Sequence, residues 1–125
     1  MSTEFDAVSH KVIGCAIEVH RQLGPGLLES VYRMCLAYEL SAAGCTCEQE
    51  RPVPIRYKGV DLDCGFRMDL LVEQELVVEL KSVEVLLPVH GAQLLTYLKL
   101  SGLRTGLLIN FNSKILRNGV RRLVR

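Results

Sequence analysis

Two apolar runs separated by a short polar segment constrain the fold of this chain more than any other feature. The runs Phe66–Val72 and Leu76–Lys81 are rich in leucine and valine, and the polar segment Glu73–Glu75 lies between them. Short apolar runs on either side of a polar turn are typical of a β-hairpin. The pattern predicts two antiparallel strands that turn about Gln74.

Charged side chains interrupt this hairpin at positions that would otherwise be apolar. A turn that is symmetric about Gln74 places Asp69 opposite Glu79, and directly opposed Cβ atoms lie about 4.5–5.5 Å apart. Glu79 and Lys81 are two residues apart and so share a face of their strand, while Val78 points into the opposite layer. The sequence therefore predicts two carboxylates and one ammonium group close together.

Such a cluster has two explanations. Like charges at this distance destabilise a sheet unless a positive charge lies between them, and a divalent metal ion would supply that charge. The alternative is a plain salt bridge from Lys81 to Asp69 or Glu79 on a solvated face. The salt bridge accounts for the lysine and one acid but leaves the second acid unexplained.

Helical periods precede the hairpin. The first predicted helix runs from near Asp6 to Leu23, with Gly24–Gly26 ending it, and the second covers about Leu28–Ala43, with Gly44 as its C-terminal left-handed glycine. The apolar spacing predicts an inward face in each helix. The expected inward residues are Val8, Val12, Cys15, Val19 and Leu23 in the first helix, and Val31, Cys35 and Tyr38 in the second.

Strand-like pieces and one more helix complete the order. Short peripheral strands are expected at Thr46–Glu50, Val53–Tyr57 and Val60–Leu62, and a third helix at Pro88–Leu100. A buried strand is expected at Thr105–Phe111, followed by a tight turn at Asn118–Gly119 between two short basic strands. The order of two helices, a strand meander, a helix and a strand predicts an α/β fold.

Length and composition indicate one domain. With 125 residues, 49% of them hydrophobic, the chain can build one core, so we expect a single domain over residues 1–125. No apolar run approaches the roughly 18 residues of a membrane span. Glu4 and Asp6 stand where a signal peptide would be basic. We therefore expect a cytoplasmic protein with no membrane partner.

Charge is distributed unevenly along the chain. All fourteen acidic residues lie at or before Glu84 together with eight basic residues, whereas seven basic residues follow without an acidic neighbour. This basic third either forms a polyanion-binding face or neutralises the acidic part within the fold. The five cysteines lack the spacing of a zinc or haem site, so free thiols are expected.

The hairpin residues also resemble a known signature. Asp69, nine intervening residues and then Glu79-Leu80-Lys81 resemble the PD-(D/E)xK motif, although Met68 stands where the proline of that name would be. The segment Gly26–Tyr32 matches the motif of the GxxExxY protein family, which is grouped with the PD-(D/E)xK nucleases. The resemblance covers about Val12 to Phe111 and implies a restriction-endonuclease-like core, a central mixed β-sheet flanked by α-helices.

The same resemblance implies roles for the hairpin residues. Asp69 and Glu79 would hold Mg²⁺ or Mn²⁺, and the backbone carbonyl of Leu80 would add a ligand. Lys81 would orient the attacking water and stabilise developing charge. The loss of the motif's proline at Met68 leaves all of these residues in place.

Glu29 and Tyr32 lie three residues apart on one helical face. Glu29 is either a further metal ligand or the third-position partner of a helix N-cap at Gly26. Tyr32 is either a substrate contact or a packing residue.

A third group lies on the predicted helix that follows the hairpin. Gln93 and Tyr97 are four residues apart, with His90 on the same stripe, and Gln93–Tyr97 resembles the QxxxY motif of RecB-type nucleases. The resemblance implies substrate contacts. The alternatives are a solvated glutamine beside a half-buried tyrosine, and a histidine that caps the helix.

Together these features predict a Mg²⁺- or Mn²⁺-dependent nuclease that hydrolyses phosphodiester bonds of nucleic acid, with DNA expected rather than RNA. The alternative is a non-catalytic domain that keeps the fold and binds nucleic acid or protein. The basic tail could cradle a nucleic-acid strand or seal a homodimer.

Overall fold

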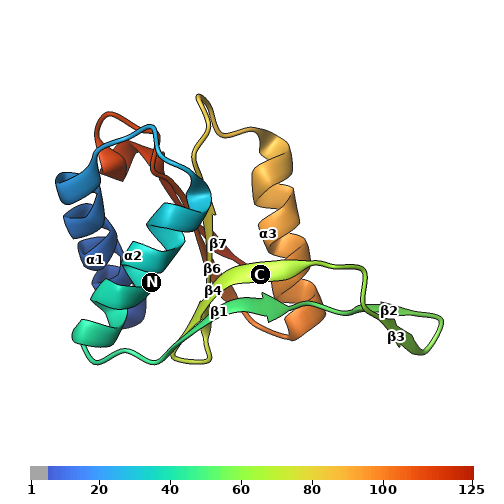
Figure 1. Cartoon of the computed structure of the whole chain (residues 1–125). Coiled ribbons are helices and arrows are strands. Elements are labelled where there is room, and N and C mark those ends of the chain that lie inside the picture. Colours follow the sequence, from blue (N-terminus) through green and yellow to red (C-terminus); the bar gives the residue numbers. More distant parts are fainter. Residues whose placement is uncertain (1–5) are drawn as a thin grey trace.

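Three helices flank a mixed five-stranded sheet (Figure 1). The computed structural model describes residues 6–125, so Glu4 lies outside the described part. The strands β5 and β6 are parallel, and the other neighbouring pairs are antiparallel. In spatial order the strands are β1 (Cys47–Pro52), β4 (Arg67–Val72), β5 (Leu76–Lys81), β6 (Thr105–Asn110) and β7 (Val120–Val124). The predicted α/β fold with a mixed sheet is confirmed.

The central hairpin has the predicted register. Val72 pairs with Leu76 and Leu70 with Val78, so the two strands turn symmetrically about Gln74. The turn residues Glu73 and Gln74 both have positive φ, as a tight hairpin turn requires. The shorter strands β2 (Ile55–Tyr57) and β3 (Val60–Leu62) form a separate two-stranded sheet.

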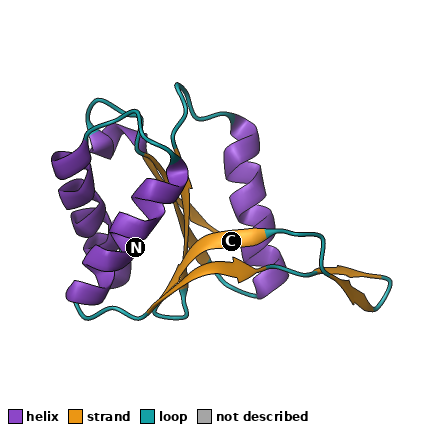
Figure 2. Ribbon diagram, viewed as in Figure 1, coloured by secondary structure: helices purple, strands orange, loops and turns teal. Residues whose placement is uncertain are grey.

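Helices cover both faces of the sheet (Figure 2). The helices α1 (Ala7–Leu23) and α2 (Glu29–Ala42) pack on one face, and α3 (Pro88–Ser101) packs on the other. Val78 and Leu80 belong to the core under α1 and α2, whereas Val77 belongs to the core under α3. Strand alternation therefore directs Glu79 and Lys81 toward the α3 side.

The predicted inward face of α2 is only partly correct, because Cys35 packs partly buried against the core but Val31 and Tyr38 are exposed. The buried residues are Tyr32, Leu36 and Leu40, whereas Tyr38 is 72% exposed. Apolar residues occur nearly all round this helix, so spacing alone did not select a face. Tyr32 fixes the rotation, because its ring stacks on Phe111 at a centroid distance of 4.4 Å.

The start of α1 agrees with the prediction from the sequence, whereas the end of the chain does not. Asp6 caps α1, since its Oδ1 accepts the Ser9 N–H at 2.8 Å. The expected pair of basic strands about Asn118–Gly119 is not formed. Residues Leu116–Gly119 form a short 3-10 helix, and only β7 follows it. This strand pairs with β6, which supplies a long partner that a local hairpin would lack.

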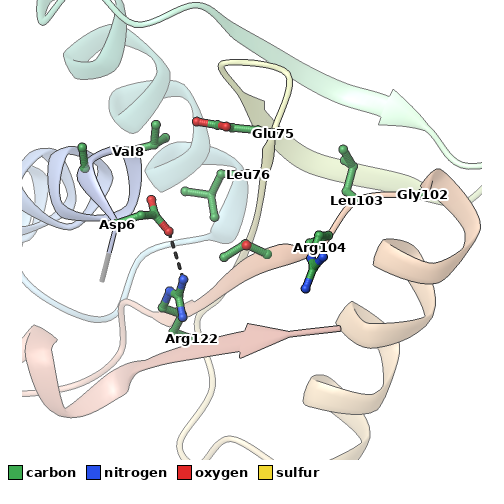
Figure 3. Close-up of a pocket in the computed structure, with 10 residues that line it drawn as sticks. Asp6, Val8, Glu75, Leu76, Gly102, Leu103, Arg104 and Arg122 are labelled. Atoms are coloured by element: carbon green, nitrogen blue, oxygen red, sulfur yellow. Dashed lines mark hydrogen bonds and ion pairs between the residues drawn. The ribbon is translucent and has the colours of Figure 1, made fainter. Parts of the chain in front are cut away.

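Part of the basic C-terminal third is neutralised within the fold. Arg122 forms an ion pair with Asp6 at 3.1 Å, in a pocket where β5 and β6 begin (Figure 3). The other basic residues after Glu84 form no ion pair within residues 6–125. They are Lys99, Arg104, Lys114, Arg117, Arg121 and Arg125. Among the described residues, Arg122 is therefore the one member of the basic third that an ion pair neutralises.

Two further findings concern cysteines and membrane spans. All five cysteines are free thiols, and four of them are partly buried, which agrees with the expectation of structural thiols. No helix within the described residues is both long enough and apolar enough to cross a bilayer.

Candidate active site

The strands β4 and β5 separate where the predicted carboxylates lie. Their pairing ends at Leu70 and Val78, and side chains replace the next backbone hydrogen bonds. Glu79 Oε2 accepts the Asp69 N–H at 2.8 Å, and Asp69 Oδ2 accepts the Leu80 N–H at 2.7 Å. We call this point, defined by Asp69, Glu79 and Leu80, the fork. Each carboxylate uses one oxygen here, so its second oxygen is available to another partner.

The neighbouring strand is also irregular beside the fork. The pairing of β1 with β4 joins Gln49 to Leu70 and Arg51 to Met68, and it omits Glu50 and Asp69. Glu50 has a φ of 52°, a left-handed conformation that costs a non-glycine residue about 1 kcal/mol or more. Asp69 therefore lies where the ladders on both sides of β4 are interrupted.

Burial and mutual repulsion make the fork electrostatically unfavourable without a cation. Only 5% of Glu79 is exposed, and this burial, together with the neighbouring Asp69, raises the Glu79 pKa to about 8. Burial also raises the Asp69 pKa, although the hydrogen bond from the Leu80 N–H opposes that rise. A cation at the fork would favour both charged forms.

Lys81 is close enough to lower the pKa of both carboxyl groups. It forms no ion pair with either of them in the described part of the chain. The ion pair that the plain salt-bridge alternative requires is therefore not formed between Lys81 and either carboxylate. Lys81 is half-buried, and its backbone carbonyl accepts the Phe111 N–H at 2.9 Å, which holds the end of β5 in place.

Glu29 approaches the fork from α2. Its negative charge contributes to raising the pKa of both Asp69 and Glu79, and its Oε2 lies 3.4 Å from the Ser82 nitrogen. The N-cap of α2 is Leu28, so Glu29 is the first helical residue. The predicted cap at Gly26 with Glu29 as its third-position partner is therefore wrong, because the helix begins later. A favourable interaction with the helix dipole remains.

The chemistry of the fork suits a hard divalent cation. Mg²⁺ and Mn²⁺ prefer oxygen ligands, and Mg²⁺ usually keeps several waters and binds through only one or two carboxylates. Asp69 and Glu79 supply two such carboxylates, and the Leu80 carbonyl stays a predicted third ligand. Within residues 6–125, no three histidine, cysteine, aspartate or glutamate side chains gather as a metal-binding group. Water or a substrate phosphate would have to complete the coordination.

The helix α3 brings Tyr97 toward the fork. Burial raises the Tyr97 pKa, and the charges of Glu79 and Asp69 raise it further. Gln93 Nε2 donates to Tyr97 Oη at 3.2 Å, so the two residues of the QxxxY pattern contact each other. Tyr97 is more buried than the expected alternative of a half-buried tyrosine. Their role as substrate contacts stays a prediction.

The structure assigns a capping contact to His90. Its Nδ1 accepts the Leu87 N–H at 2.9 Å, at the start of α3. This is the capping alternative noted from the sequence. One ring nitrogen is engaged in this contact, so any substrate contact would have to use Nε2.

Tyr32 is a packing residue, as one of the two alternatives for it predicted. Its side chain has no exposed surface, its hydroxyl donates to the Gly24 carbonyl at 2.6 Å, and it accepts the Leu27 N–H at 3.1 Å. Because a substrate does not reach a fully buried ring, the predicted substrate contact is corrected to a structural one. Tyr32 ties the loop before α2, and Ser82 Oγ donates to the Leu27 carbonyl at 2.6 Å. Tyr32 thus supports the loop beside Glu29.

Sequence analysis missed two residues near the fork. Arg33 on α2 lowers the Asp69 pKa, and its Nη1 lies 3.5 Å from Glu50 Oε1. Asn110 is buried and exchanges hydrogen bonds with the backbone of Val83, which pins the segment after Lys81. A lone amide in the apolar strand was the available signal for Asn110. The sequence holds no comparable signal for Arg33, because the residues that it approaches, Glu50 and Asp69, are distant from it in sequence.

Comparison with known proteins agrees with this geometry. The family model described as the PD-(D/E)XK nuclease superfamily matches residues 6–123. No curated protein and no solved structure matches the chain. The matched region includes all three helices, every residue of the fork and the five-stranded sheet up to Leu123 in β7. The chain therefore belongs to the PD-(D/E)XK nuclease superfamily.

Proposed function

We propose that residues 1–125 act as one nuclease domain that uses Mg²⁺ or Mn²⁺ to hydrolyse phosphodiester bonds, with DNA as the substrate. The observation that carries this proposal is the fork, where two carboxylates replace the strand ladder and Lys81 lies on the same strand face. Buried like charges with raised pKa values are typical of a functional site. Membership of the nuclease superfamily supports the same reaction class.

The residues at the fork and around it would have different roles in hydrolysis. Asp69 and Glu79 would hold the metal ion, which when bound polarises the scissile phosphate and lowers the pKa of a water molecule. Lys81 would orient the attacking water and stabilise the negative charge that develops on the phosphoryl oxygens. Glu29 would contribute through water at the open side of the site, since its carboxylate approaches Ser82 rather than contacting the fork directly.

The proposal extends to the narrower GxxExxY family. Each residue of that motif has a physical reason to be present. Gly26 has a φ of 98°, which favours glycine, Glu29 approaches the fork, and Tyr32 holds the intervening loop through Gly24 and Leu27. The motif thus describes a loop and the first helical turn after it, which together bring one carboxylate to the site.

One observation favours a second candidate, a nucleic-acid-binding domain without catalysis. No third metal-binding side chain joins Asp69 and Glu79 among the described residues. A pair of carboxylates alone could hold a metal ion too weakly for turnover. This candidate predicts binding of DNA without cleavage.

Cleavage of labelled single-stranded and double-stranded DNA separates the two candidates. Wild type, Asp69→Ala and Lys81→Ala are prepared identically and assayed with Mg²⁺ or Mn²⁺. The nuclease predicts metal-dependent cutting that falls by a factor of about a hundred or more in both variants. Equal cutting by all three proteins would reveal a contaminant, and binding without cutting would favour the second candidate.

A further inference from the structure

A two-stranded arm projects from the sheet beside the fork. The arm comprises residues 53–66, in which β2 and β3 pair through a turn at Lys58 and Gly59. Both turn residues have positive φ, 49° and 80°, as a two-residue hairpin turn requires. Figure 1 shows the arm extending past α3, away from α1 and α2.

The two faces of the arm differ in chemistry. Directly paired residues share a face, and the pairs Ile55 with Leu62 and Tyr57 with Val60 make one face apolar. Tyr57 is 58% exposed and Val60 is 56% exposed. A lone two-stranded ribbon is only marginally stable in water. An uncovered apolar face on such a ribbon indicates a binding surface.

The arm connects directly to the fork. Phe66, at the base of the arm, is exposed, and its ring lies 6.1 Å from that of Tyr97. The charges of both fork carboxylates raise the Tyr97 pKa, so this tyrosine lies near the fork as well as near Phe66. Phe66 also accepts the Val53 N–H through its backbone carbonyl at 2.9 Å. The exposed Phe66 ring therefore joins the base of the arm to the buried Tyr97 beside the fork.

Charge on the arm favours an anionic partner. Both acidic residues are already neutralised, Asp61 by Arg56 at 3.0 Å and Asp63 by Arg67 at 3.3 Å. Lys58 at the tip lies over the Tyr57 ring at 5.5 Å and has no ion pair within residues 6–125. The surface thus combines exposed aromatic rings with an available cation, as proteins that bind single strands do.

We propose that the arm binds unpaired bases of a single DNA strand whose phosphodiester backbone passes the fork, with Tyr57 and Phe66 as stacking platforms and Lys58 as a phosphate contact. This inference rests on the proposed nuclease function and names its substrate class. A second copy of the chain fits the arm less well. The Lys58 cation at the tip of the arm favours an anionic strand, whereas the arm of a second copy carries the same cation.

Binding measured without metal tests the inference separately from cleavage. The full chain is titrated with labelled oligothymidylate in EDTA, and anisotropy reports the dissociation constant. Tyr57→Ala and Phe66→Ala are each expected to weaken binding about ten-fold, since each removes a ring on which a base would stack. Tyr57→Phe keeps the ring and should bind like wild type. Tyr38→Ala, at an exposed tyrosine on α2, is the matched control and should also bind like wild type.

The charge of Lys58 and the oligomeric state of the chain provide two further tests. Lys58→Glu should weaken binding and flatten its dependence on salt, and it leaves the apolar face intact if Tyr57→Ala disturbs the arm. Equal affinity of all variants would overturn the inference and leave the nuclease proposal untouched. A wild-type dimer that Tyr57→Ala converts to a monomer would also overturn it. Single-strand binding that depends on Tyr57, in a chain that never cleaves, would support the arm and contradict the nuclease.

Discussion

Glu79 is a buried acid whose only hydrogen bond among the described residues comes from the Asp69 N–H. That single bond opposes the burial and the repulsion from Asp69 that raise the Glu79 pKa. Lys81 attracts Glu79 without forming an ion pair with it. In the absence of metal, Glu79 is therefore expected to hold its proton at neutral pH.

The sign of the resulting pH dependence follows from linkage. The ordinary pKa of Glu79 is 4.5 and its folded pKa is about 8. Between these values the folded chain holds a proton that the unfolded chain releases, so stability falls as pH rises through this window. In metal-free buffer, Glu79→Gln should remove this loss of stability with rising pH. Urea unfolding should find the variant more stable than wild type at about pH 9, by on the order of 2 kcal/mol.

The advantage of Glu79→Gln should shrink as pH falls through the window and vanish only below the ordinary pKa of 4.5, where both states hold the proton. Glu75→Gln, at an exposed acid in the hairpin turn, is the matched control and should follow wild type. A difference between Glu79→Gln and wild type that is independent of pH would contradict the raised Glu79 pKa.

At the scale of elements, the loop before α2 depends on one hydroxyl. Tyr32→Phe keeps the stacking on Phe111 but leaves the Gly24 carbonyl and the Leu27 N–H without their partner. Loss of these bonds should lower the free energy of unfolding by about 1–2 kcal/mol in urea. Tyr38→Phe changes an exposed hydroxyl on the same helix and should stay within about 0.5 kcal/mol of wild type. Equal effects of the two variants would contradict the anchoring role.

Two glycines test how α3 packs on the sheet. A Cβ at Gly106 in β6 would lie 2.9 Å from Leu94 Cδ1, and Leu94 is fully buried. Gly106→Ala should therefore destabilise the fold by about 1–3 kcal/mol through overpacking.

The second glycine supplies the contrast. A Cβ at Gly91 would meet only Leu123 Cδ1, at an ordinary contact distance of 3.7 Å. Gly91→Ala should stabilise α3 by about 0.5–1 kcal/mol, because alanine favours a helix. Thermal unfolding of the two variants in one buffer compares them directly. A stable Gly106→Ala protein would contradict the close contact between α3 and β6.

At the scale of the whole molecule, the sequence predicted features that depend on local periods. The hairpin register about Gln74 follows from turn chemistry, and the placement of Val78 on the face opposite to Glu79 follows from strand alternation; both are confirmed. The end of the first helix at Gly24 is also as predicted, since glycine marks it directly.

Features that depend on distant contacts could not be predicted. The rotation of α2 depends on Tyr32 meeting Phe111, which is far along the chain, while the apolar stripe through Val31 looked equally suitable. The separation of β4 from β5 at the fork and the left-handed Glu50 arise where three strands meet. The sequence predicted that Asp69 and Glu79 would be neighbours, but not that they replace the backbone ladder.

Isothermal titration of the metal-free protein with Mn²⁺ shows whether Asp69 and Glu79 together hold a divalent cation. Wild type and Glu75→Gln are expected to bind one Mn²⁺ per chain saturably, and Asp69→Asn and Glu79→Gln are expected to lose that binding. Both amides can still accept the fork hydrogen bonds, so the fold should persist. Undiminished Mn²⁺ binding by the two fork variants, or none by the wild type, would contradict the account.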